Sequence, residues 1–271
     1  MSRPVVLKLG GELLEDRGGV KKIARTIARL AKQGPLVVVH GGGQEIDAAL
    51  AQAAIPKHQI DGLRITDEAT LQVVVAVLAG SINTRLVAAI NAAGAPAVGL
   101  TGADAGVAPV KPARPHQASN GELVDLGLVG EPLPLSAPKL IKSLFAKRFV
   151  PVIASIGASK DGRLYNVNAD TLAGSLASRL HAKRLVIAGT TAGVLGSRGR
   201  TLSNLNRDGI DQLVGSGTAT SGMIAKLRAC RKAVDRGVRE VVIADGRDAK
   251  RLATLVGGSA ARKGPWTRIA K

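Results

Sequence analysis

Two glycine-rich segments of the chain have residues that could bind an anion. The first, VVLKLGGELL at 5–14, places Lys8 inside an apolar run just before Gly10 and Gly11. The second, LVVVHGGGQEIDAAL at 36–50, has three consecutive glycines between an apolar run and a helix-like stretch. Glycines let backbone N–H groups approach an anion closely, and a helix N-terminus adds partial positive charge. A tight turn explains one glycine in each segment but not three in a row, so we predict that these loops hold an anion. Neither segment has the spacing of a Walker A loop or a dinucleotide-binding fingerprint.

A lysine and a polar cluster further along the chain are candidates for the same site. Lys226 borders the apolar stripe of a helix expected over Gly222–Arg236, near its start, where a positive charge opposes the helix dipole. It is either a lysine with its stem on apolar surface and its charge in water, or a cation aimed at a buried anion. Asn166, Asn168 and Asp170 lie just before another expected helix. Asn168 or Asp170 would cap that helix, but three polar groups exceed the need of one cap and could hold a substrate and orient a lysine.

The elements that must position these residues follow an α/β pattern. Short β-branched runs alternate with helical stretches, which predicts a mainly parallel sheet covered by helices on both faces. Sites in such sheets form beyond the carboxyl ends of the strands, where both glycine segments fall. An SNG turn at 119–121, within a region rich in proline and glycine, predicts a β-hairpin excursion, and we place a lobe boundary near 179–184. The expected strands are Val5–Leu9, Leu36–Val39, Ala97–Leu100, Pro151–Ile153, Leu185–Ala188 and Glu240–Ala244, and the expected helices are Val20–Lys32, Glu45–Ala54, Ala69–Ala93, Pro138–Lys147, Ala169–Leu180 and Gly222–Arg236.

The composition restricts the partners and the compartment. The net charge of +18 fits nucleic acid, an acidic protein or anionic small molecules, but only 1% of the residues are aromatic, which argues against stacking on bases. One cysteine fits a reducing compartment, and with no signal peptide and no uninterrupted apolar run of about 20 residues we expect a cytoplasmic protein without a membrane partner. The four histidines lack metal-ligand spacing, so we expect no metal held by protein side chains alone.

Six motifs together resemble the amino acid kinase family. They are VVLKLGGELL, VVVHGGGQEIDAAL, DGLRITD, VDLGLVGE, YNVNADTLAG and SGMIAKL, in the family's order and spacing. The resemblance implies a three-layer αβα sandwich with a mainly parallel central sheet. It also implies an acyl-acceptor lobe over 1–180 that forms a homodimer, and an ATP lobe over 181–271. The branch it resembles most phosphorylates the side-chain carboxylate of N-acetyl-L-glutamate with ATP in arginine biosynthesis, and Mg²⁺ would arrive with the nucleotide.

The resemblance also implies roles for single residues. Lys8 and Lys226 would stabilise the phosphoryl group in transit, and Asp170 would hold both lysines in place. No general base is needed, because an attacking carboxylate is already ionised at pH 7. The remaining roles are phosphate binding for Gly10 and Gly11, acceptor binding for Gly42, Gly43, Arg64 and Asn166, and nucleotide binding for Thr190, Thr191, Gly193, Leu195, Thr218 and Thr220.

One departure and two alternatives stay open. Members of the family usually carry an aspartate after the first strand of the ATP lobe, where this chain has a threonine, Thr190 or Thr191 depending on the alignment. The first alternative is a sibling kinase of lysine biosynthesis that acts on aminoadipate or glutamate attached to an acidic carrier protein. The high positive charge and the segment VIADGRDAK fit it. The second alternative is a regulatory, nucleic-acid-binding protein without catalytic activity.

Overall fold

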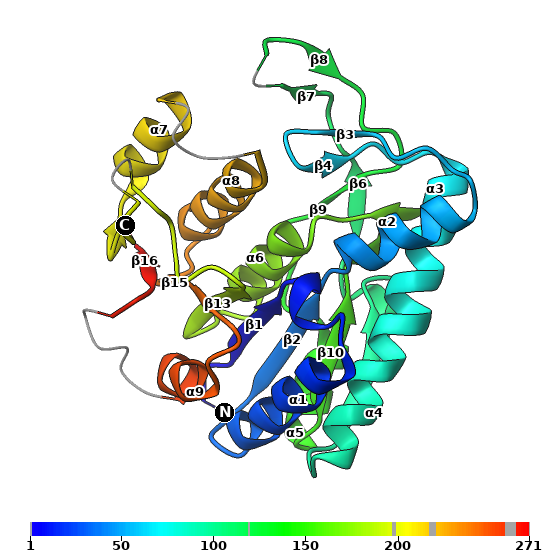
Figure 1. Ribbon diagram of the computed structural model, residues 1–271. Helices are drawn as coiled ribbons and strands as arrows, with labels where there is room; N and C mark the ends of the chain where they lie inside the picture. Colours follow the sequence, from blue (N-terminus) through cyan, green and yellow to red (C-terminus); the bar gives the residue numbers. More distant parts are fainter. Residues whose placement is uncertain (1, 119, 197–198, 217–220, 258–263, 271) are drawn as a thin grey trace.

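A single eight-stranded sheet runs through the centre of the computed structural model, which describes residues 2–118, 120–196, 199–216, 221–257 and 264–270 (Figure 1). Its strand order is β14-β16-β15-β13-β1-β2-β10-β5, and all neighbours run parallel except β15 and β16. The strands of this sheet are β1 (Val5–Leu9), β2 (Leu36–His40), β5 (Ala97–Thr101), β10 (Val150–Ala154), β13 (Arg184–Gly189), β14 (Asn204–Leu205), β15 (Val241–Asp245) and β16 (Thr267–Ile269).

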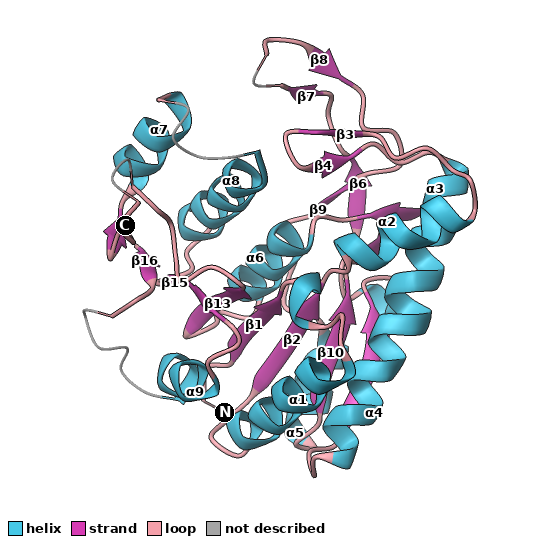
Figure 2. Cartoon of the chain, in the orientation of Figure 1, coloured by secondary structure: helices cyan, strands magenta, loops and turns pink. Residues whose placement is uncertain are grey.

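Helices cover both faces of the sheet, as Figure 2 shows. One face packs against α1, α2, the long α3–α4 helix and α9, and the other packs against α5, α6, α7 and α8. The helices are α1 (Arg17–Ala31), α2 (Gly43–Gln52), α3 (Glu68–Val75), the π-helix η2 (Ala76–Asn83), α4 (Thr84–Ala92), α5 (Lys139–Ala146), α6 (Ala169–Arg179), α7 (Arg207–Gly215), α8 (Ser221–Asp235) and α9 (Ala249–Gly257), with 3-10 turns η1 (Gly11–Leu13) and η3 (Asp104–Gly106).

The alternation of side chains along β1 decides which way Lys8 points. All five residues of β1 are buried. Val5, Leu7 and Leu9 belong to the core under α1 and α9, whereas Val6 belongs to the core under α6 and α8. Because side chains alternate along a strand, Lys8 shares the α6–α8 face with Val6. The strand therefore directs a lysine toward the helices that carry Asp170 and Lys226.

Within the described residues, four short two-stranded ribbons stand apart from the central sheet, three of them toward the top of Figure 1. They pair β3 (Gln59–Ile60) with β4 (Leu63–Arg64), β6 (Val110–Pro112) with β9 (Gly130–Pro132), β7 (His116–Gln117) with β8 (Leu123–Val124), and β11 (Ile156–Ala158) with β12 (Leu164–Asn166). The predicted hairpin is confirmed by β7 and β8, although Ser119 in its turn lies outside the described residues.

The predicted α/β architecture is confirmed. Each of the six expected strands and six expected helices corresponds to an observed element, with ends that differ by a few residues. Our reading did not anticipate α7, α9, β14 and β16, which complete the edge of the sheet beside β15. The expected lobe boundary falls at the end of α6, after which β13 continues the same sheet beside β1. The assignment of separate roles to the two lobes stays a prediction.

One helical stretch, Glu68–Ala92, has the length and mean hydropathy of a membrane span, 25 residues and 1.9, by composition alone. In its most apolar window 39% of the residues are buried. The buried ones include Val74, Leu78, Leu86 and Ile90, which pack into the core against α1 and β5. A core helix passes the same test of composition, and packing explains this inward stripe.

Candidate active site

Lys8, Asp170 and Lys226 come together at the centre of the molecule. Lys8 Nζ lies 2.9 Å from Oδ1 of Asp170, and Lys226 Nζ donates a hydrogen bond of 3.1 Å to Oδ2. Lys8 and Asp170 are only 7% and 6% exposed. The three residues come from β1, α6 and α8, which are far apart in the sequence. One buried carboxylate thus holds two ammonium groups side by side, an arrangement able to stabilise a further anion.

The local structure of α6 separates a capping residue from a functional one. The Asn168 side chain accepts a hydrogen bond of 3.0 Å from the backbone N–H of Thr171 and caps the helix. Asp170, two residues further on in the first turn of the helix, is not needed for the cap and faces the lysines. Of the two capping candidates, Asn168 therefore fills that role, and Asp170 is left for electrostatics.

Burial and charge act against each other in this cluster. Burial opposes ionisation of Asp170, but Lys8 and Lys226 outweigh it and hold the pKa of that carboxyl well below its usual range. Burial, together with the nearby Lys226 charge, lowers the pKa of Lys8 despite Asp170. For Lys226 burial also acts to lower the pKa, but Asp170 wins and raises it. Asp170 is therefore an anion at neutral pH, and Lys226 is the more firmly protonated lysine.

The two glycine loops touch each other beside these lysines. A Cβ on Gly11 would lie 2.8 Å from Cα of Gly42 and 3.0 Å from the backbone nitrogen of Gly43, closer than real Cβ atoms come. A Cβ on Gly42 would overlap the Ile82 side chain, so packing alone requires glycine there. Gly43 differs, since no described atom lies within 4 Å of its Cβ position. Close packing thus explains Gly11 and Gly42, whereas Gly43 leaves open space at the start of α2.

The N-terminus of α2 is suited to an anion. Gly42 is its N-cap, and among the described residues no side chain caps the helix. The first N–H groups of a helix lack partners within the helix and carry partial positive charge. Gly43 is exposed and its surroundings are open, so the anion that we predict at this loop would have room to bind.

The buried Arg64 has a donor without a partner. Its Nη2 pairs with Oδ1 of Asp47, which also binds Lys57, but no described residue accepts a hydrogen bond from its buried Nη1. An unpaired buried donor is costly, and a carboxylate would satisfy it. Thr66, two residues on, accepts a hydrogen bond of 3.1 Å from the Asn166 side chain. Thr66 thus links the segment of Arg64 to Asn166, and both Arg64 and Asn166 are predicted to bind the acceptor. Asn166 itself lies on the chain segment that leads to Asp170.

His40 and Asn83 support the second glycine loop, a role that our reading of the sequence missed. The amide of Asn83 donates to His40 Nε2 and to the carbonyl oxygen of Val152, both at 3.0 Å. His40 Nδ1 lies 3.1 Å from the carbonyl oxygen of Gly41 and donates to it in the same tautomer. Burial lowers the pKa of His40 to about 4, so it stays neutral at physiological pH. The π-helix η2 ends at Asn83 and presents it to this loop.

Four of the residues predicted to bind the nucleotide follow β13. Thr190 and Thr191 are exposed at its carboxyl end, and Leu195 is an exposed large apolar side chain. A Cβ on Gly193 would meet Thr267, so packing against β16 explains that glycine. Thr218 and Thr220 lie outside the described residues. The nucleotide roles of this set stay predictions.

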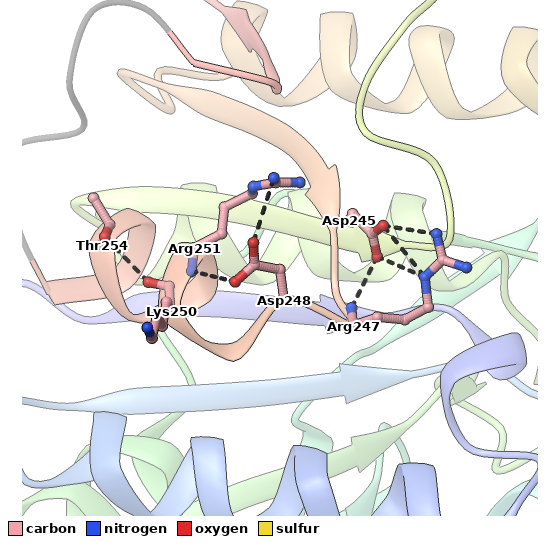
Figure 3. Close-up of polar contacts among 6 residues, drawn as sticks. All are labelled: Asp245, Arg247, Asp248, Lys250, Arg251 and Thr254. Atoms are coloured by element: carbon pink, nitrogen blue, oxygen red, sulfur yellow. Dashed lines mark hydrogen bonds and ion pairs between the residues drawn. The ribbon is translucent and has the colours of Figure 1, made fainter.

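Asp245 and Arg247 close the same edge from the neighbouring strand (Figure 3). Asp245 ends β15 in register with Gly189 at the end of β13. Arg247 binds both oxygens of Asp245 and donates a hydrogen bond of 2.9 Å to the carbonyl oxygen of Thr190. A carboxylate is thus present at this edge, although not at the position that the family pattern led us to expect.

Protein side chains alone offer no metal centre in the described part of the chain, where no group of three or more His, Cys, Asp or Glu could hold an ion. The single cysteine is also a poor nucleophile. Cys230 is buried, and burial raises its pKa to about 12. The chemistry that remains is binding and stabilising anions at the carboxyl ends of parallel strands, which fits phosphoryl transfer.

Comparisons with known proteins agree with this class of site. The family described as the amino acid kinase family matches residues 3–245, and the chain belongs to that family. The chain is 43% identical over 253 residues to acetylglutamate kinase from Parvibaculum lavamentivorans, and 39% identical over 250 residues to acetylglutamate kinase from Rhodospirillum centenum. Each match covers 90% of this chain and 82% of the relative.

Solved structures share the fold. N-acetylglutamate synthase from Neisseria gonorrhoeae, complexed with coenzyme A and N-acetyl-glutamate, superposes with a TM-score of 0.79 at 25% identity, covering 99% of this chain and 59% of that one. Carbamate kinase from Giardia lamblia bound to AMP-PNP superposes with a TM-score of 0.70 at 20% identity, covering 100% and 99%. The predicted fold and family are confirmed.

Proposed function

We propose that this protein transfers the γ-phosphoryl group of ATP to the side-chain carboxylate of N-acetyl-L-glutamate in arginine biosynthesis. The names of relatives about 40% identical over nine-tenths of the chain support this activity. The structural observation that carries it is the buried Asp170, which holds Lys8 and Lys226 beside two touching glycine loops. Such a site brings cationic groups to a place where two anions must meet.

The lysines address the main difficulty of this reaction. Carboxylate and triphosphate repel each other, and charge develops on the transferred group between them. Lys8 and Lys226 offset that charge, and Asp170 fixes their positions in advance, so that little reorganisation is needed during the reaction. The acceptor carboxylate is already ionised, so no residue has to remove a proton. Cys230, four residues after Lys226 on α8, is buried, and burial raises its pKa to about 12, so it is protonated at neutral pH and is not a general base.

The acceptor and the nucleotide are proposed to approach from opposite sides of the lysines. The unpaired Nη1 of Arg64 suits the carboxylate of the acetylated amino acid, and Asn166 lies nearby on the same side. Gly42 and Gly43 would receive the acceptor at the start of α2, and Gly10 and Gly11 would receive the phosphates. The ATP side is assigned to residues 181–271, where Thr190, Thr191, Gly193 and Leu195 lie at or near the carboxyl end of β13. Mg²⁺ would arrive with the nucleotide and neutralise phosphate charge.

A homodimer in the cytoplasm is the proposed working form. β5 is the outermost strand at one end of the sheet, and next to it lies a groove of about 490 Å³ lined by Asn83, Thr84 and Gly99. The helix beside this groove exposes the small residues Ala76 and Ala88. A partner edge and helix from a second copy would cover both features. A single cysteine fits the cytoplasm, which also supplies ATP.

The test is ATP turnover with N-acetyl-L-glutamate, trapping the acyl phosphate with hydroxylamine. We expect acceptor-dependent hydroxamate from the wild type and a fall of roughly 100-fold or more in Lys226→Ala, since this is the usual loss when one well-placed donor is removed. Lys232→Ala is the matched control, because Lys232 lies on the same helix but pairs with Glu131 outside the site. Equal activity of the two variants would contradict the role of Lys226.

The net charge of +18 favours one second candidate, a kinase whose acceptor is carried by an acidic protein. A folded wild type that makes no hydroxamate from free N-acetyl-L-glutamate, but does so from glutamate or aminoadipate attached to an acidic carrier, would replace the first proposal by this one.

A further inference from the structure

Glu12 places a carboxylate between the ends of two neighbouring strands at the phosphate side of the site. Gly10 follows β1 and donates a backbone hydrogen bond of 2.8 Å to Ala188 on β13. A Cβ on Gly10 would overlap both carboxylate oxygens of Glu12, and a Cβ on Gly189 would lie 2.9 Å from its Oε1. The carboxylate therefore rests against both glycines. Neither glycine has a positive φ, so what they provide here is the absence of a side chain.

The Glu12 carboxylate is available to a ligand. Glu12 is exposed on the short turn η1 (Gly11–Leu13), and no hydrogen bond or ion pair to another described residue holds its side chain. It is near enough to act on both lysines. Burial lowers the pKa of Lys8 and acts the same way on Lys226. The charge of Glu12 acts in the opposite direction on both lysines, toward a higher pKa.

The charges in this cluster cancel. Two ammonium groups, Lys8 and Lys226, face two carboxylates, Asp170 and Glu12, and Asp170 already binds both lysines. A metal-free triphosphate would meet Glu12 as a repelling charge. A metal–nucleotide complex would meet it as a ligand, since Mg²⁺ is commonly bound by one or two carboxylates together with substrate phosphates. The exposed carboxylate thus fits the cation better than it fits the phosphates.

We propose that Glu12 is a carboxylate ligand of the Mg²⁺ that accompanies ATP, and that it makes the site select the metal–nucleotide complex over metal-free nucleotide. This inference rests on the proposed function, because it requires the phosphates to bind beside Lys8. It adds a protein ligand to a cation that the nucleotide would otherwise hold alone.

The experiment compares the affinity for AMP-PNP with excess Mg²⁺ and with EDTA, by calorimetry on wild type, Glu12→Gln and Glu15→Gln. Glu15 is an exposed glutamate three residues further on, so Glu15→Gln makes the same charge change away from the glycines. We expect Glu12→Gln to weaken the Mg²⁺ complex and to reduce its preference over metal-free nucleotide roughly tenfold, within the range usual for coupled sites. Glu15→Gln should keep the wild-type ratio. With Mn²⁺ in place of Mg²⁺, the electron paramagnetic resonance spectrum of the bound ion should change only in Glu12→Gln.

Two results would overturn the inference while leaving the proposed function intact. One is an unchanged ratio in a folded Glu12→Gln. The other is a tighter binding of metal-free nucleotide with no weakening of the Mg²⁺ complex, which would make Glu12 only a repelling charge. A wild type that binds neither form would overturn the proposed function, and this inference with it.

Discussion

Asp170 is the residue on which the arrangement of both lysines depends, and Asp170→Asn tests it with almost no change of shape. The substitution removes the single negative charge between two ammonium groups, in a place where Asp170 and Lys8 are 6% and 7% exposed. Breaking a buried ion pair by removing one partner costs about 3–5 kcal/mol, because the remaining charge stays buried. We expect a loss of this size in the free energy of unfolding near neutral pH. Turnover should fall with it, because the lysines lose their anchor.

The assay is urea unfolding of the wild type and variant at several pH values, with Asp248→Asn as the control. Asp248 pairs with Arg251 at 3.3 Å with its side chain 42% exposed, and asparagine can keep its cap on α9, so a change under about 1 kcal/mol is expected. The loss in Asp170→Asn should shrink as the pH rises toward 10. In the folded variant the two lysines, without Asp170, would release their protons at lower pH than they do in the unfolded chain. The free energy of unfolding of the variant then rises with pH, because the unfolded state binds more protons. A loss no larger than that of Asp248→Asn, or one independent of pH, would refute the reasoning.

Two further predictions concern the acceptor side and the loop that supports it. Arg64→Lys keeps the charge but loses the planar fork whose Nη1 is unpaired, so KM for N-acetyl-L-glutamate should rise about 10- to 100-fold with a smaller change in kcat. Steady-state kinetics with varied acceptor would show it, and an unchanged KM would assign Arg64 to Asp47 alone. His40, with its pKa lowered to about 4 by burial, stabilises the fold fully above its unfolded pKa of about 6.5. Between these values the unfolded state binds the proton first, and about 3 kcal/mol should be lost as the pH falls. The free energy of unfolding of wild type and His40→Gln, measured over this pH range, gives the contribution of His40. Equal slopes of that free energy against pH in the two proteins would contradict the prediction.

Much of the fold was predictable because it rests on local patterns. The strand Val5–Leu9 is entirely buried, as a β-branched run between two helical layers should be, and the helix Ala169–Arg179 starts where its asparagine cap predicts. The glycines of the two loops marked the edge of the sheet where the site lies, because Gly11 and Gly42 allow close packing there and Gly43 leaves open space. The missed elements, such as β14 with its two residues, are too short to carry a periodic signal.

The rest of the site depends on contacts that no local pattern records. Asn83 lies in a stretch that reads as one apolar helix, and only the packing of that helix brings its amide to His40. The missing partner of Arg64 Nη1 is visible only once its neighbours are placed. Nothing in the sequence singles out Glu12, because its significance comes from Gly189 on another strand.

The unexpected threonine after β13 and the unexpected position of Glu12 concern the same place. Thr190 lacks the carboxylate that the family pattern led us to expect, and the nearby Asp245 is taken up by Arg247. Glu12, however, brings an unpaired carboxylate to Gly189, the residue directly before Thr190, from a different strand. The edge between β1 and β13 therefore keeps one carboxylate that is not already bound to a lysine or arginine among the described residues. Because the charge at a site depends on where a group lies and not on which strand carries it, the threonine alone is no reason to expect a disabled nucleotide site.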